Sequence, residues 1–376
     1  MNMPKVAIVH EWLVDRSGSE KVVEQILEIY PDAALFAIVE YLPQELKWFI
    51  KNKKVTTSFV QKLPFSKTSY RNYFPLMPIA VEQFDLSEFD LVISSNHAVS
   101  KGVLTSSEQL HVCYCHSPIR YAWDLYHQYI FESGLKKGLK GMLAKFFLHY
   151  LRLWDISAVN RVDFFVANSS FIAKRIKKVY NRKSTVIYPP VNVDEFSLCA
   201  QKEDFYITVS RFVPYKKIDL IVQAFSKMPN RKLIVIGDGP DFKKISRTKF
   251  DNVQFLGFQK SEVVKAYMQR AKCFVFASIE DFGITPVEAM ACGTPVIALK
   301  KGGARETVID GVTGIFFNEQ HEKSIRDAVS RFEELPIFDS VKIREHAEKF
   351  SNNRFRNQFK KFVEDKISEF NSTYHS

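Results

Sequence analysis

The chain has 376 residues, of which 46% are hydrophobic and 25% are charged, and its formal net charge is +11. This length exceeds one ordinary hydrophobic core, so we expect two domains. The composition is that of a globular protein, and the chain contains no run of about 18 or more apolar residues that would predict a membrane-spanning helix. An apolar strand pattern begins at Val6, which leaves no room for a signal peptide before it, so we expect none.

Strand and helix signals alternate along the first half of the chain. The apolar run Val6–Val9 predicts the first strand, and the turn Ser17–Lys21 opens a helix that continues to Leu27. Further strands are predicted at Leu91–Ser94, Val112–Cys115, Phe164–Ala167 and Thr185–Tyr188. The proline-rich stretch Pro189–Asp194 cannot continue a helix and predicts a linker.

A second alternating series follows the linker. Its predicted strands are Tyr206–Ser210, Lys232–Ile236, Val253–Leu256, Phe274–Ala277 and Pro295–Ala298, and its predicted helices include Lys217–Phe225 and Val263–Arg270. This alternation predicts an α/β protein with parallel sheets and helices on both faces. We expect two doubly wound, Rossmann-like domains, residues 1–190 and 195–350, that face each other across a cleft. The C-terminal segment 351–376 is predicted to be a helix that packs back on the first domain.

The segment Glu280–Glu288 reads EDFGITPVE and lies between a predicted strand and a predicted helix. Thr285 and Glu288 have the spacing of a capping box, with Pro286 at the first helical position. A helix start after a strand favours an anion, whereas the carboxylate of Glu280 has to face another group, such as sugar hydroxyls. The pattern indicates a ligand with a negative end and a hydroxylated end, for which a nucleotide sugar is a good candidate.

Four segments, in this order, resemble the retaining glycosyltransferases of family 4, which have the GT-B fold. They are Ser210–Lys217 (Arg-x4-Lys), Gly237–Pro240 (Gly-x-Gly-Pro), Glu280–Glu288 (E-x7-E) and the glycine-rich stretch Gly302–Gly314. The resemblance covers essentially the full chain and is sharper in its C-terminal half. It implies that Arg211 and Lys216 neutralise the donor diphosphate and that Glu280 contacts the donor sugar.

The same resemblance implies further donor-binding positions. Gly283, Ile284 and Thr285 would offer backbone N–H groups to the sugar and phosphate, and the turn Gly257–Phe258 would contact the base. Glu288 would bind the ribose hydroxyls, although its capping role is equally supported by the sequence. A plain turn is nearly as good an explanation of Gly257.

In the first half, the resemblance implies roles at the ends of predicted strands. His116 would contact the transferred sugar; the alternative is a histidine whose bonds are satisfied within the fold. Gly18 would let the backbone approach the donor phosphates, although serines flank it where many relatives have two glycines. Asn96–Val99 would line the acceptor side.

No metal or other cofactor is expected. The five cysteines are scattered and offer no second pair with the spacing of metal ligands. The chain also lacks an Asp-x-Asp motif, and the two cations Arg211 and Lys216 can stabilise the leaving diphosphate.

The segment Gly134–Trp154 is basic and contains no Asp or Glu. Its apolar residues fall on one helical face: Leu135, Leu139, Met142, Leu143, Phe146, Phe147, Tyr150 and Trp154. This pattern predicts a helix that binds an anionic membrane surface, and we expect a cytoplasmic protein on the inner face of the cell membrane. The alternative is a helix packed in the core with a solvated basic face.

The segments Phe74–Pro78 and Tyr114–Asp124 are similar to bacterial mannosyltransferases of O-antigen or related polysaccharide synthesis. This similarity implies GDP-mannose as donor and a polyprenyl-diphosphate-linked sugar as acceptor. The main alternative is a UDP-glucose or UDP-N-acetylglucosamine enzyme of the same fold, and a sugar-nucleotide epimerase is a minor one. A nucleic-acid binder would explain the charge but not the E-x7-E motif, so no nucleic-acid partner is expected.

Overall fold

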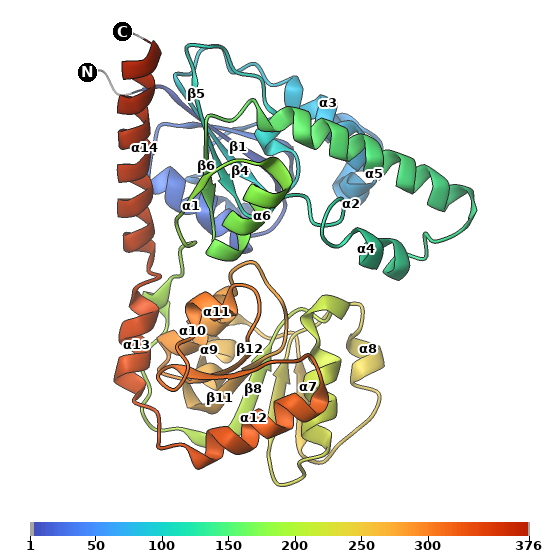
Figure 1. Ribbon diagram of the computed structural model, residues 1–376, viewed down its shortest axis with the longest axis vertical. Coiled ribbons are helices and arrows are strands. Elements are labelled where there is room, and N and C mark those ends of the chain that lie inside the picture. Colours follow the sequence, from blue (N-terminus) through green and yellow to red (C-terminus); the bar gives the residue numbers. More distant parts are fainter. Residues whose placement is uncertain (1–3, 375–376) are drawn as a thin grey trace. The chain divides into compact units, whose positions relative to one another are not determined.

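The structure, a computed structural model, describes residues 4–374. The chain divides into two compact units: Met1–Pro189 with Phe355–Ser376, and Pro190–Arg354. Each unit contains one parallel β-sheet with helices around it (Figure 1).

The first unit contains a seven-stranded sheet with the order β3-β2-β1-β4-β5-β6-β7. The strands are β1 (Val6–Leu13), β2 (Ala34–Glu40), β3 (Val55–Thr57), β4 (Leu91–Asn96), β5 (Leu110–Cys115), β6 (Phe164–Ala167) and β7 (Ser184–Val186). All neighbours pair in parallel, and the strand order reverses between β1 and β4, where His10 pairs with Ser95. In doubly wound sheets this reversal point is where ligands bind, beyond the carboxyl ends of the strands.

Successive residues of β1 enter two different hydrophobic cores. Ile8 belongs to one core, and Ala7 and Val9 belong to the other, because adjacent side chains of a strand point to opposite faces. The first four residues of the strand, Val6–Val9, are therefore all apolar, as expected for a sheet that is covered on both faces.

Helices cover both faces of the first sheet. They are α1 (Gly18–Ile29), α2 (Ser66–Ser69), α3 (Met77–Glu82), α4 (Tyr126–Glu132), α5 (Gly138–Val159), α6 (Ser170–Tyr180) and the C-terminal α14 (Asn352–Tyr374). Short 3-10 helices lie at η1 (Gln44–Ile50), η2 (Phe59–Lys62), η3 (Tyr70–Leu76) and η4 (Ser100–Gly102). Phe355, Phe359 and Val363 of α14 are buried in the core that contains Ile8, and Figure 1 shows α14 beside this sheet.

The second unit contains a six-stranded sheet with the order β10-β9-β8-β11-β12-β13. Its strands are β8 (Glu203–Val209), β9 (Leu233–Ile236), β10 (Val253–Gly257), β11 (Ala271–Phe276), β12 (Val296–Leu299) and β13 (Gly314–Phe317). Its helices are η5 (Val193–Glu195), η6 (Pro214–Lys216), α7 (Ile218–Ser226), α8 (Phe242–Ile245), α9 (Ser261–Arg270), α10 (Ile284–Ala291), α11 (Ala304–Thr307), α12 (Glu322–Glu334) and α13 (Ser340–Glu348). The order reverses between β8 and β11, so this sheet has its own ligand-binding edge.

The predicted strands are present, with shifts of a few residues at their ends. The largest shift is in β1, which continues to Leu13 rather than ending at Val9. His10, Glu11 and Trp12 therefore lie within the strand, where His10 and Glu11 are fully buried. Strands β2, β3 and β13 have no counterpart in the sequence-based prediction.

Candidate active site

In the second unit, the predicted site residues follow the two strands that flank the reversal point. Arg211 follows β8 and is exposed, and Lys216 ends the short helix η6. Glu280 follows β11. Because β8 and β11 are parallel neighbours, their carboxyl ends bring these segments to the same edge of the sheet.

Lys216 and Glu280 form an ion pair at this edge. Both side chains are 19% exposed, so each is accessible but largely enclosed. Ser278 donates a hydrogen bond from its hydroxyl to Glu280 Oε1 at 2.8 Å. The carboxylate is therefore held by one cation and one hydroxyl.

The helix after Glu280 starts differently from the predicted capping box. Helix α10 begins at Ile284, its N-cap is Gly283, and no side chain caps it. Gly283 has φ 87°, a left-handed conformation that glycine adopts without strain, and this lets the helix begin before Thr285. Glu288 then lies one full turn inside the helix, so the predicted capping box of Thr285 and Glu288 is wrong. The N–H groups of Ile284 and Thr285 belong to the first turn, which has no intrahelical acceptors.

Two glycines of the loop after β12 support the backbone around Glu280. The N–H of Gly303 donates to the carbonyl of Glu280 at 2.8 Å. A Cβ atom at Gly303 would lie 2.3 Å from Cα of Phe282, and one at Gly302 would lie 2.5 Å from the carbonyl oxygen of Glu280. Only residues without a side chain fit this contact.

The turn Gly237–Pro240 supports the loop that carries Arg211 in a similar way. A Cβ atom at Gly237 would lie 1.8 Å from the carbonyl oxygen of Ser210. Gly237 also donates its N–H to the carbonyl of Gly257 at 2.9 Å. Gly257 ends β10, and the next residue, Phe258, is 78% exposed.

In the first unit, a cluster of polar side chains lies at the carboxyl ends of β1, β4 and β5. His116 follows β5, and its Nε2 lies 2.9 Å from the hydroxyl of Ser95. Burial and the nearby imidazoles of His97 and His10 lower the pKa of His116 to about 3. His116 is therefore neutral at pH 7 and can form a hydrogen bond without carrying charge.

His10 and Glu20 occupy the interior of the same cluster. Burial alone would lower the pKa of His10, but the hydrogen bond and charge of Glu20 outweigh it and raise this pKa. Burial alone would raise the pKa of Glu20, but the hydrogen bond and charge of His10 lower it to about 2. The two side chains, 3.2 Å apart, therefore form a buried imidazolium–carboxylate pair.

Gly18 is the first residue of α1, beside Glu20. The carboxylate of Glu20 accepts hydrogen bonds from the N–H and the hydroxyl of Ser17, at 3.2 and 2.6 Å. A carboxylate in the first helical turn accepts hydrogen bonds from N–H groups at the helix start and interacts favourably with the helix dipole. A phosphate near Gly18 would therefore meet a negative charge, which His10 offsets.

Helix α5 presents two apolar faces rather than the single predicted one. Leu148, Leu151 and Trp154 are buried in the first unit, and Leu135 and Phe147 are partly buried against them. A second face is exposed and consists of Leu139, Met142, Leu143, Phe146, Tyr150, Leu153 and Ile156. The predicted face is therefore divided between the core and the surface. Within residues 4–374, no helix is long and apolar enough to cross a membrane.

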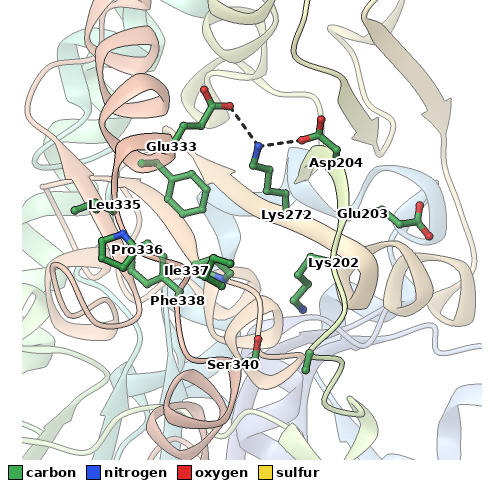
Figure 2. A pocket seen from close by; sticks show the side chains of 13 residues that line it. Lys202, Glu203, Asp204, Lys272, Glu333, Leu335, Pro336, Ile337, Phe338 and Ser340 are labelled. Carbon is green, nitrogen blue, oxygen red and sulfur yellow. Dashed lines mark hydrogen bonds and ion pairs between the residues drawn. The ribbon is translucent and has the colours of Figure 1, made fainter.

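A cavity of about 390 Å³ lies at the opposite edge of the second sheet, where β8, β11 and β12 begin. Figure 2 shows Lys272 between Asp204 and Glu333, with which it forms ion pairs of 2.9 and 3.5 Å. Lys202 also lines the cavity, and burial lowers its pKa to about 8. None of the predicted site residues lines this cavity.

Sequence reasoning missed several polar residues of these sites. Ser278 and Ser95, each at or just after the end of a strand, hold Glu280 and His116. Glu20 is also buried, and its position three residues after Ser17, the spacing of a capping box, is the signal that could have found it.

The two domains match two glycosyltransferase families. Residues 42–195 match "Glycosyltransferase Family 4", and residues 192–356 match "Glycosyl transferases group 1". The chain has the GT-B fold, and each of its two domains matches a glycosyltransferase family model. The second match contains Arg211, Lys216, Glu280 and Glu288, and the first contains His116.

Individual proteins are similar to this chain over part of their length. An uncharacterised glycosyltransferase of Methanocaldococcus jannaschii is 30% identical over 52% of the chain and 54% of its own length. The O-antigen chain mannosyltransferase RfbU of Salmonella typhimurium is 28% identical over 50% of the chain and 56% of its own length. The chain thus spans about half the length of the curated relatives it matches.

Solved structures match the chain over nearly its full length. Anabaena HepE in complex with UDP-glucose has a TM-score of 0.67, with 17% identity, over 96% of this chain and 100% of that one. At this identity the match establishes the fold alone.

Proposed function

We propose that the chain is a retaining glycosyltransferase that transfers a hexose, mannose from GDP-mannose, to a lipid-linked acceptor. The observation that carries the proposal is the Lys216–Glu280 pair at the reversal point of the second sheet. It places a cation and a carboxylate beside a helix start that no side chain caps. A diphosphate requires cations and N–H groups, and a sugar requires a hydrogen-bond acceptor such as a carboxylate.

In this proposal, Arg211, Lys216 and the N–H groups of Ile284 and Thr285 bind the donor diphosphate. Helix starts and fixed cations both favour anions. Glu280 accepts hydrogen bonds from hydroxyls of the donor sugar. The turn Gly257–Phe258 contacts the base.

Glu288 binds the ribose hydroxyls in this proposal. Its alternative role in a capping box fails because α10 begins at Ile284. With the capping box removed, ribose binding is the role that the family resemblance leaves for Glu288.

The transfer breaks the bond between the anomeric carbon and the diphosphate oxygen, whose electron pair leaves with the diphosphate. The acceptor oxygen forms its bond on the same face of the sugar, and the acceptor proton passes to the leaving phosphate. Arg211 and Lys216 stabilise the charge that develops on the diphosphate. Neutral His116 binds the transferred sugar, and Gly18 allows the backbone to approach the phosphates. No metal ion is required by this scheme.

The donor and acceptor are inferred from the relatives and the surface. RfbU is an O-antigen chain mannosyltransferase, which supports GDP-mannose and an acceptor linked to polyprenyl diphosphate. The exposed apolar face of α5, in a segment without acidic residues, supports binding to an anionic membrane where such an acceptor resides. A UDP-glucose or UDP-N-acetylglucosamine donor is the second candidate, since the same fold holds UDP-glucose in HepE.

Calorimetry with GDP, UDP, ADP and TDP tests the proposal, followed by the matching sugar nucleotides. Tight binding of GDP alone supports mannose transfer. A preference for UDP would indicate a UDP-sugar, in place of GDP-mannose, as the donor. Binding of none of the four contradicts the proposed function. NMR of the anomeric proton in the product then determines whether the configuration is retained.

A further inference from the structure

A buried carboxylate orients the imidazole of His97 at the reversal point of the first sheet. Glu11 lies in β1 with its side chain fully buried, and His97 follows the neighbouring strand β4 with 28% of its side chain exposed. Glu11 Oε2 and His97 Nδ1 are 2.9 Å apart. The edge of the Trp12 ring packs on His97, with 4.7 Å between ring centroids.

Glu11 is held as an anion by the backbone. Its Oε1 accepts from the N–H groups of the four residues after β4: His97, Ala98, Val99 and Ser100, at 2.9, 2.8, 3.2 and 3.3 Å. Burial alone would raise the pKa of Glu11, but His97 and these N–H groups lower it well below its ordinary value. An ionised carboxylate offers only lone pairs.

The charge of Glu11 determines the tautomer of His97. A lone pair on Nδ1 would face an anionic oxygen at 2.9 Å, so Nδ1 carries a hydrogen in the neutral ring. Nε2 then carries the lone pair. Among residues 4–374, no hydrogen-bond partner of Nε2 is found, and the exposed part of the ring allows a ligand to reach this atom.

We propose that His97, oriented by Glu11, binds the sugar acceptor through a hydrogen bond from an acceptor hydroxyl to Nε2. The ligand class follows from the chemistry: the lone pair that the neutral ring places on Nε2 accepts from an O–H donor and not from a phosphate. Glu11 is a positioning residue, because it acts only through His97. This inference rests on the proposed glycosyl transfer.

Other groups of the cluster are arranged for different bonds. His116 Nε2 already bonds to Ser95, and His10 is engaged by Glu20 and Ser95. Within the described residues, no group of three or more His, Cys, Asp or Glu side chains is arranged to hold a metal ion. Unlike the Nε2 atoms of His116 and His10, Nε2 of His97 is therefore available to an acceptor hydroxyl.

The tautomer can be measured without any substrate. Imidazole ¹⁵N shifts of the histidine-labelled chain, with His97→Gln for assignment, are expected to show hydrogen on Nδ1 and a bare Nε2 in His97. A hydrogen on Nε2 in the neutral ring overturns the inference. This result does not depend on the proposed function.

Kinetics test the role of His97 with mannosyl polyprenyl diphosphate in detergent as the acceptor probe. His97→Ala is expected to lower kcat/KM for the acceptor by about tenfold, the effect of one lost hydrogen bond, through a higher acceptor KM. Nucleoside diphosphate affinity is expected to stay unchanged. His97→Gln keeps a hydrogen-bonding amide at the position of Nε2 and is expected to recover part of the loss.

The outcomes separate this inference from the proposed function. An unchanged acceptor KM in His97→Ala, in a chain that transfers sugar, overturns the inference and leaves the function intact. A wild-type chain that binds no nucleotide defeats the proposed function and, with it, the acceptor role of His97. Glu11→Gln supplies a second variant. Its amide N–H can face a lone pair on Nδ1 of His97, so Nδ1 no longer has to carry the hydrogen. This variant is expected to reproduce the rise in acceptor KM.

Discussion

Lys216 and Glu280 neutralise each other at the carboxyl ends of two neighbouring strands, although they are 64 positions apart in the sequence. In the proposed function, each contacts a different part of a nucleotide sugar: the ammonium contacts the diphosphate and the carboxylate contacts the sugar. The pair would then hold both groups in place and compensate their charges before the donor arrives. Substitution of Glu280 is expected to reduce sugar transfer, and substitution of Lys216 is expected to weaken nucleoside diphosphate binding.

Glu280→Ala is expected to reduce sugar transfer by about 100-fold or more, the loss typical of removing a group that stabilises the transition state. Affinity for the nucleoside diphosphate should stay the same or rise, because Lys216 is released from its carboxylate partner. Transfer assays and calorimetry on the same preparation measure both. Glu334→Ala, which removes an exposed carboxylate at the end of α12, is the matched control, and an active Glu280→Ala chain would refute the assignment.

Lys216→Ala is expected to weaken nucleoside diphosphate binding by about 10- to 100-fold, the equivalent of one charge-assisted hydrogen bond. It also leaves the carboxylate of Glu280 without its cation beside the bound anion. Calorimetry at two salt concentrations should show a weaker salt dependence than in the wild-type chain. Unchanged affinity would mean that Lys216 only pairs with Glu280. Lys217→Ala provides the control on the adjacent residue.

Phe146→Asp is expected to abolish sedimentation with vesicles that contain anionic phospholipid. Phe146 is 72% exposed at the centre of the apolar face of α5, and a charge there opposes burial in the lipid interface. Ile337→Asp places the same change on a fully exposed apolar side chain of the second unit and should leave binding intact. Two outcomes would show that α5 is not the membrane contact. In the first, the wild-type chain does not sediment with these vesicles. In the second, the Phe146→Asp chain sediments as well as the wild-type chain.

The first unit is expected to lose stability as the pH falls from about 6.5 toward 4. Burial lowers the pKa of His111 to about 4, below its unfolded value of about 6.5. The unfolded chain therefore binds more protons in this window, and stability that is present above pH 6.5 is lost as the pH falls. One such group contributes a slope of about 1.4 kcal/mol per pH unit.

Denaturation followed by tryptophan fluorescence measures this slope for the first unit alone, because the tryptophans, Trp12, Trp48, Trp123 and Trp154, all lie in it. His111→Gln removes the titrating group and should show a shallower slope between pH 6.5 and 4. Equal slopes in the two chains would show that His111 does not bind its proton preferentially in the unfolded state.

Much of the architecture could be predicted because its signals are local. Apolar runs of four to six residues marked most strands, and Gly or Pro turns marked their ends. The prediction of the start of α10 failed because two nearby residues can each start a helix. Thr285 has a side chain that can cap a helix, but the left-handed conformation of Gly283 lets α10 begin earlier, at Ile284. Strands β2, β3 and β13 were not predicted, and two of them have only three or four residues, too few for a clear apolar run.

The sequence by itself determined the two alternating α/β domains, the reversal-point residues Arg211, Lys216, Glu280 and His116, and the family resemblance they carry. Only the tertiary structure decided which of these residues touch. Lys216 meets Glu280, and Glu11 meets the backbone of His97 from 86 residues away, because parallel pairing brings the ends of strands distant in sequence to one edge of a sheet. Folding also decided which apolar face of α5 is buried, since that depends on the core the helix packs against and not on the spacing of its own residues.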